Sequence, residues 1–171
     1  MSFDSKSYKI GGLTVEGESL YFCSNDSPKI SKVSIGKENF GQIISTNEIV
    51  IHNHGLNLLN GLASYEGVLF YSVFAGWSSS IIMYDYKKGQ ELSSFFCKAD
   101  DLTYDGKYLW CSDSQNGRNK GFISKYDINS GKEIAFFRSP GLFPSGLAYG
   151  NGFIWLADQK ENLIYKILVA E

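Results

Sequence analysis

Hydrophobic residues occur along this chain in short runs of strand length, separated by turns that combine an acid or amide with glycine. At Asp105-Gly106, a short apolar run precedes the turn and a run rich in aromatic residues follows it. Glycine suits such turns because it adopts the positive φ that a tight hairpin requires. No segment of sufficient length shows helical periodicity. The pattern therefore predicts an all-β protein built from antiparallel hairpins.

Four stretches of nine residues align with one another without a gap, which indicates an internal repeat. Each opens with leucine followed by Thr or Ala, contains glycine, and closes with an aliphatic and an aromatic residue; they are 13–21, 62–70, 102–110 and 147–155. Their leucines are 49, 40 and 45 residues apart. Downstream, isoleucine and a second apolar residue recur three positions apart, at 30/33, 81/84, 123/126 and 164/167. The spacing is close to the roughly 40 to 45 residues of one propeller blade.

Turns after the third strand of two repeats lead into a fourth apolar segment, so each unit reads as a blade of four antiparallel strands. We therefore predict one domain, a four-bladed β-propeller over 1–171. The last repeat ends too early to supply its own fourth strand, whereas residues 2–10 precede the first repeat. We expect 2–10 to pair with the last blade and close the ring, because closure removes exposed edges. The expected blades are 11–56, 57–98, 99–142, and 143–171 with 2–10.

The segments 101–113 and 144–158, the latter followed by 162–167, resemble the repeat of NHL, YVTN and streptogramin-lyase-like propellers. The resemblance implies the propeller fold over nearly the whole chain, but these families include scaffolds, binders and enzymes. Their members usually have five to seven blades or more, so four blades form either a small ring or half of an eight-bladed dimer. Small residues beside the first-strand leucines suit a crowded axis and favour a monomer; they are Thr14, Ala63, Thr103 and Ala148.

Composition narrows the classes of partner. Hydrophobic residues make up 43% of the chain, enough for a core, and the net charge of −2 gives no electrostatic footprint for nucleic acid. No apolar run reaches the length of a bilayer span, and the first residues lack the pattern of a secretion signal, so we expect a cytoplasmic protein. Cys23, Cys97 and Cys111 are odd in number and not spaced as metal ligands, which favours free buried thiols.

Propeller sites usually lie at the mouth of the central channel, on the face that carries the turns into each innermost strand and those after each second strand. The repeat places eight candidate ligand-binding residues there: Asn60, Asp100, Asp101 and Ser145 in the entering turns, and Trp77, Asp113, Arg118 and Asp158 in the others. Trp77 could be a platform for a sugar ring or a partner side chain, or fold back on the blade edge. Arg118 could clamp an anion or lie in a solvated loop.

Asp113 and Asp158 share one repeat position, where the other blades have Ser24 and Val73. Each aspartate could cap its own turn by accepting backbone N–H groups. The pair could instead contribute to an oxygen site for Ca²⁺ or Mg²⁺. The two histidines, His52 and His54, fall on one face of a predicted outer strand and read as an inert surface pair.

No nucleophile elbow, phosphate-binding glycine loop, zinc-protease helix or kinase signature is present in the sequence. Their absence speaks only against those classes. From the propeller fold we expect a non-enzymatic binding module that presents the channel mouth to a small molecule or a protein. The alternative is a metal-dependent lyase or lactonase-like enzyme, with Asp113 and Asp158 at a channel-mouth metal.

Overall fold

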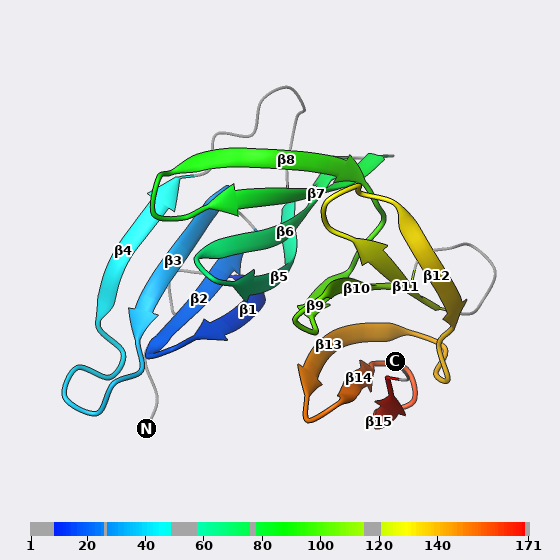
Figure 1. The fold of residues 1–171 in the computed structure, drawn as a ribbon. Coiled ribbons are helices and arrows are strands. Elements are labelled where there is room, and N and C mark those ends of the chain that lie inside the picture. Colours follow the sequence, from blue (N-terminus) through cyan, green and yellow to red (C-terminus); the bar gives the residue numbers. More distant parts are fainter. Residues whose placement is uncertain (1–8, 26, 49–57, 76–77, 115–120, 170–171) are drawn as a thin grey trace.

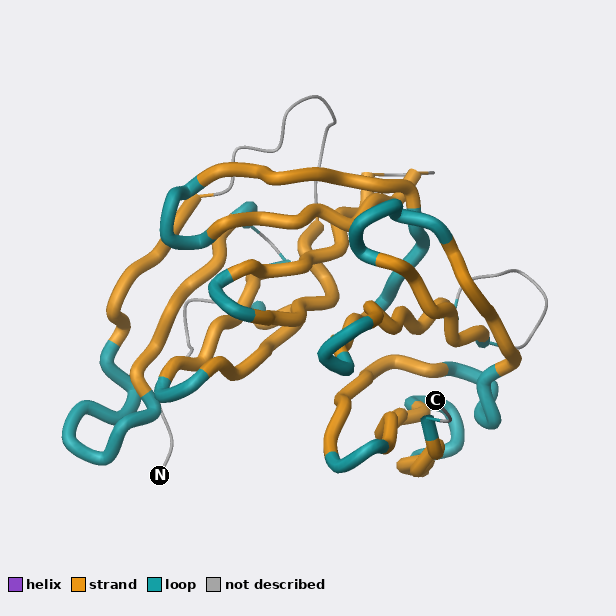
Figure 2. The backbone as a smooth tube through the Cα atoms, viewed as in Figure 1, coloured by secondary structure: helices purple, strands orange, loops and turns teal. Residues whose placement is uncertain are grey.

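The computed structural model describes residues 9–25, 27–48, 58–75, 78–114 and 121–169. All regular structure in these residues is β-strand, as predicted, and Figure 2 shows strands joined by loops and turns. None of these elements is a helix that could cross a membrane. The strands form four antiparallel sheets, each built from consecutive segments of the chain (Figure 1).

Each sheet follows the chain from its innermost to its outermost strand. The first contains β1 (Ile10–Glu16), β2 (Ser19–Ser24), β3 (Lys29–Ser34) and β4 (Ile43–Glu48). The second contains β5 (Leu58–Tyr65), β6 (Val68–Ala75), β7 (Ser78–Asp85) and β8 (Gln90–Phe96). The third contains β9 (Asp101–Tyr104), β10 (Tyr108–Asp113), β11 (Phe122–Asp127) and β12 (Glu133–Arg138). The fourth contains β13 (Pro144–Gly150), β14 (Phe153–Asp158) and β15 (Leu163–Leu168).

The sheets are arranged as the blades of a propeller. The innermost strands contact one another in chain order, β1 with β5, β5 with β9, and β9 with β13. Three hydrophobic clusters join the first blade to the second, the second to the third, and the third to the fourth. The fold is therefore the predicted four-bladed β-propeller, and its core lies between blades.

The predicted hairpin turns are present in each repeat. Gly17, Gly67, Gly106 and Gly152, between the first and second strands of their blades, all have positive φ. In the third blade, Asp105 stabilises the turn beside Gly106: its Oδ1 accepts hydrogen bonds from the backbone N of Lys107 and Tyr108, at 2.8 and 2.7 Å. Its Oδ2 accepts one from Nε1 of Trp110 at 2.7 Å, which links the turn to the second strand.

The expectation that residues 2–10 pair with the last blade is tested only at residues 9 and 10, which lie in the first blade. Ile10 pairs with Ser24 inside the first blade, and the carbonyl of Lys9 accepts a hydrogen bond from the backbone N of Asn25. Residues 9 and 10 therefore extend β1 and do not join the last blade. A register irregularity between Ile10 and Leu13, at two glycines, lets the pairing continue that far. The described sheet of the last blade has three strands, and residues 2–8 lie outside the described residues.

Close backbone contacts join consecutive inner strands along the propeller axis. A Cβ at Gly61 would lie 2.7 Å from Cα of Asp101, so glycine is what allows β5 and β9 to approach so closely. Between the first two blades, Oγ1 of Thr14 and Oγ of Ser64 are 3.0 Å apart and share a hydrogen bond. Ala63 and Thr103 are buried between neighbouring blades. The small residues therefore permit close packing of consecutive inner strands.

Candidate functional site: a cleft between the second and third blades

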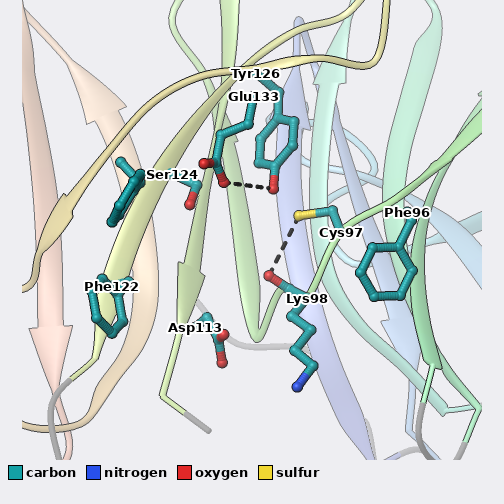
Figure 3. A pocket seen from close by; sticks show the side chains of 9 residues that line it. Phe96, Cys97, Lys98, Asp113, Phe122, Ser124, Tyr126 and Glu133 are labelled. Carbon is teal, nitrogen blue, oxygen red and sulfur yellow. Dashed lines mark hydrogen bonds between the residues drawn. The ribbon is translucent and has the colours of Figure 1, made fainter. Parts of the chain in front are cut away.

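A cleft of about 270 Å³ lies between the second and third blades. Its second-blade side is formed by Phe96 at the end of β8 and by Cys97 and Lys98 in the turn that leads to β9 (Figure 3). The third blade contributes six residues from β10, β11 and β12: Asp113, Phe122, Ser124, Tyr126, Glu133 and Phe136. The cleft is therefore an opening in the interface between two blades.

Strand alternation explains why these third-blade residues line one wall. Phe122, Ser124 and Tyr126 are two residues apart in β11, so their side chains project from the same face of the sheet. Phe136 pairs with Ser124 across β11 and β12, and therefore projects from that face too. The rings of Phe122 and Phe136 have their centroids 6.1 Å apart, which is an aromatic contact.

The innermost part of the cleft contains a thiol and a phenol. The hydroxyl of Tyr126 donates a hydrogen bond to Oε2 of Glu133 at 3.1 Å, and Sγ of Cys97 donates one to the carbonyl of Lys98 at 3.4 Å. Burial raises the pKa of Tyr126, and burial beside Cys97 raises the pKa of Cys111 in the same core. The Tyr126 phenol and the Cys111 thiol therefore stay protonated at neutral pH, which suits packing and hydrogen bonding better than nucleophilic attack.

Lys98 and Asp113 lie at the other end of the cleft (Figure 3). Lys98 is in a turn that leads into an inner strand, and Asp113 ends a second strand, so this end opens on the face where the sequence predicts a site. Glu133 lies at the opposite end, beside Tyr126. Three phenylalanine rings line the cleft together with these charged groups, so its surface combines aromatic rings with polar groups near both ends.

Of the six candidate residues that the structure describes, only Asp113 lines this cleft. Asp100 accepts hydrogen bonds at Oδ2 from the backbone N of Ser114, at 2.6 Å, and from the Ser114 hydroxyl. Asn60 lies in β5, where its carbonyl accepts a hydrogen bond from Sγ of Cys23. Ser145 Oγ donates to the carbonyl of Ala157 at 3.3 Å. The predictions for Trp77 and Arg118 lie outside the described residues.

Asp101 is partly buried near the axis and links neighbouring blades. Its Oδ2 accepts a hydrogen bond from the backbone N of Leu147 in β13 at 2.7 Å. Burial raises the pKa of Asp101 to about 7, a shift that backbone hydrogen bonds from Leu147, Leu102 and Leu62 oppose and the nearby Asp100 increases. Because Leu62 belongs to β5 and Leu147 to β13, this carboxyl connects three consecutive inner strands.

Asp158 has the geometry of a turn cap. Its Oδ1 accepts hydrogen bonds from the backbone N of Lys160 and Glu161, at 3.0 and 2.8 Å, and Oδ2 accepts one from Phe143 at 2.6 Å. In the exposed turn of the second blade, Asp85 accepts from its i+2 and i+3 backbone N–H groups in the same way. This arrangement matches the capping interpretation of Asp158. Within the described residues, no three His, Cys, Asp or Glu side chains gather as a metal site.

Most of the cleft residues lie in strands, whereas the sequence predicts candidate residues in turns. Phe96 and Phe136 lie in the outer strands of neighbouring blades, where the pattern gives only apolar strands. A signal is present: each outer strand has adjacent phenylalanines, Phe95-Phe96 and Phe136-Phe137. Because neighbours in a strand project to opposite faces, one ring of each pair cannot face the same core as the other.

No family model and no curated protein sequence matches this chain. Among solved structures, Myxococcus xanthus glutaminyl cyclase is similar to it with a TM-score of 0.70 and 12% identity, over 94% of this chain and 66% of that one. The computationally designed protein Ika4 is similar with a TM-score of 0.61 and 14% identity, over 99% of this chain and 96% of that one. BamB from Moraxella catarrhalis is similar with a TM-score of 0.57 and 12% identity, over 98% of this chain and 50% of that one.

These neighbours are β-propeller proteins, and at such low identity the similarity shows the fold alone. The chain therefore has the β-propeller fold and spans one half to two thirds of the cyclase and BamB chains. Its finer placement among NHL, YVTN and streptogramin-lyase-like repeats stays a prediction.

Proposed function

We propose that this propeller is a protein-binding module, and that the cleft between its second and third blades accepts an apolar or aromatic side chain of the partner. One observation carries the proposal. Phe96 and Phe136 line the same cleft from neighbouring outer strands and are 65% and 64% exposed. Large aromatic side chains gain more from burial than any other residues, so two exposed rings beside one opening favour a site that a partner covers.

The size of the cleft supports a side chain as the ligand. Its 270 Å³ lies just below the roughly 300 to 1,000 Å³ of pockets that enclose whole small molecules. Protein interfaces draw most of their affinity from a few anchor residues in pockets, and Trp and Tyr are common anchors. A cleft walled by Phe96, Phe122 and Phe136 offers ring faces and edges to such an anchor.

The charged groups suit the polar surroundings of an inserted side chain. The ammonium of Lys98 can donate to a peptide carbonyl, and the carboxylates of Asp113 and Glu133 can accept from peptide N–H groups. Burial raises the pKa of the Tyr126 phenol, so this lining group stays protonated and donates a hydrogen bond to Glu133. This part of the cleft therefore suits non-covalent binding.

A titration followed by NMR tests the proposal. We expect N-acetyl-tryptophanamide and N-acetyl-phenylalaninamide to shift the backbone amide signals of Cys97, Ser124 and Phe136, whereas N-acetyl-glycinamide shifts none of them. Affinity for one side chain should be weak, with Kd in the millimolar range, because binding of such a small group must offset its lost freedom.

Two variants make this titration decisive. Phe136→Ser should weaken binding of both aromatic probes at least tenfold, because it removes an exposed ring from the cleft. Phe40→Ser is the matched control, since Phe40 is also exposed but lies outside the cleft lining, and it should leave binding unchanged. Shifts centred on Asn60 and Ser145, or equal binding by Phe136→Ser and the wild type, would show that the cleft is not the site.

A further inference from the structure

The fourth blade exposes a face that is buried in every other blade. We call it the forward face, meaning the face directed toward the next blade. In the first three blades, one aromatic residue and one isoleucine of this face belong to the hydrophobic cluster shared with the following blade: Tyr21 and Ile30, Phe70 and Ile81, and Trp110 and Ile123. The three isoleucines are 0% exposed, and the aromatic residues are at most 6% exposed. At the same repeat positions of the fourth blade, Trp155 is 41% and Ile164 is 73% exposed.

The forward face of the fourth blade has the same kinds of residues in the same arrangement as a forward face that packs against a following blade. In the first blade, Nζ of Lys32 lies 5.5 Å from the ring centroid of Tyr21, with which Lys32 pairs across β2 and β3. In the fourth blade, Nζ of Lys166 lies 5.3 Å from the ring of Trp155, its own cross-strand partner. Leu168 on β15 adds a third exposed apolar side chain. This surface therefore has the residues of a blade-to-blade interface without a blade described against it.

The opposite end of the chain exposes the complementary half of such an interface. The leucines that open the second, third and fourth repeats all belong to the cluster shared with the preceding blade; they are Leu62, Leu102 and Leu147. They are at most 9% exposed, whereas Leu13, which opens the first repeat, is 60% exposed and Val15 is 52% exposed. No hydrophobic cluster joins the fourth blade to the first within the residues described, and Figure 1 shows these blades at the two ends of an arc.

We infer that a second copy of this chain covers both ends, with the forward face of each fourth blade docked on the Leu13 side of the partner's first blade. Each chain has both surfaces of the interface, so two copies can cover each other's exposed faces through two identical head-to-tail interfaces. A head-to-tail contact forms a closed ring when its rotation returns to the start, and here it gives a ring of eight blades. The chain matches half of the BamB chain, so two copies together have about the length of that propeller protein.

The crowded axis is compatible with this arrangement. The small residues from which a four-bladed monomer is predicted lie between consecutive inner strands, as the Thr14 and Ser64 hydrogen bond shows. They are needed between β1 and β5 whether or not the fourth blade meets the first within one chain. Such an interface would remove the exposed surface of four large apolar side chains from water at each junction: Trp155, Ile164, Leu168 and Leu13.

Light scattering coupled to size-exclusion chromatography tests the inference on the full chain. We expect the wild type to have twice the chain mass of 19.1 kDa, and Ile164→Lys and Leu13→Lys to have 19.1 kDa each. Both side chains are exposed in the single chain, so circular dichroism should show the same β content in these variants. Leu92→Lys is the matched control, because Leu92 is 46% exposed and lies on β8, away from both ends of the arc. This variant should remain a dimer.

Mixing the two variants identifies the head-to-tail geometry. A pair of one Leu13→Lys and one Ile164→Lys chain has one doubly altered junction and one unaltered junction, so the mixture should regain a dimer that neither variant forms alone. A wild type of 19.1 kDa at 100 μM, a mass above two chains, or a mixture that stays monomeric would each overturn the inference. The result is independent of the aromatic-probe titration, because neither Leu13 nor Ile164 lines the cleft.

Discussion

Replacing Gly61 with alanine should destabilise the protein by at least about 3 kcal/mol, at the upper end of what overpacking in a core costs. The added Cβ would lie 2.7 Å from Cα of Asp101 and 2.8 Å from the backbone N of Leu102. Both contacts are with backbone atoms, so no side chain can rotate away to make room. The inner strands of the second and third blades would have to separate, which would open the hydrophobic cluster that joins these blades.

Urea unfolding of Gly61→Ala and Gly150→Ala checks this expectation. Gly150 is the matched control, since a Cβ there would meet no atom within 4 Å and its φ is not in the positive region. The free energy of unfolding of Gly150→Ala should therefore lie within about 0.5 kcal/mol of the wild-type value, as is usual for surface substitutions. Equal free energies of unfolding for the two variants would show that the inner strands are not as close as the structure places them.

Because of Asp101, the free energy of unfolding should fall by about 4 kcal/mol as pH rises from 4 to 7. The reason is that the pKa of Asp101 is about 7 in the folded state and 3.8 as a free side chain. Below pH 4 the carboxyl is protonated in both states. Between these values the folded state retains a proton that the unfolded state has lost, so the free energy of unfolding falls as pH rises. Above pH 7 both states are ionised and the loss is complete.

Urea unfolding at a series of pH values, with wild type and Asp101→Asn in parallel, isolates this contribution. Asparagine keeps an oxygen that can accept from the backbone N of Leu147 but does not ionise. The variant should therefore gain stability relative to the wild type across this pH range, and the gain should level off above pH 7. Asp100→Asn should keep most of this pH dependence, since the charge of Asp100 is the smallest of the causes that shift the pKa of Asp101. A constant difference between Asp101→Asn and wild type at every pH would contradict the burial of this carboxyl.

The fold could be predicted because the residues that mark its turns and inner strands recur in the repeats. Gly106 and Gly152 mark hairpin turns, and the leucine at each repeat start marks an inner strand, which the structure confirms. Exposure within the repeat could not be predicted in this way. Ile123 and Ile164 occupy the same repeat position, yet only Ile123 has a following blade against it. Burial here depends on which blade comes next, and a repeat alignment does not contain that information.

The candidate site was harder to predict because its residues come from strands of two blades and not from the turns of one face. Asp113 is at the end of its strand and was identified from its repeat position, whereas Phe96 and Phe136 resemble ordinary strand residues. Whether Phe96 and Phe136 line one cleft depends on how β8 and β12 are placed relative to each other, and these strands belong to different repeats. Asp101 was selected as a ligand-binding candidate, but its short contact with Leu147 gives it a role between blades. Turn position alone does not separate these roles.

The most direct test of this account is the reactivity of the three thiols in the native protein, because all three lie in cores that form only when blades pack together. Cys23 belongs to the cluster between the first and second blades, and Cys97 and Cys111 belong to the cluster between the second and third. All three are buried, and burial raises the pKa of Cys23 to about 12. A thiol-specific disulfide reagent at pH 8 should label none of them until urea unfolds the chain, and then should label three per chain. Rapid labelling of any of these cysteines in the absence of denaturant would contradict the packing of the repeats into a propeller.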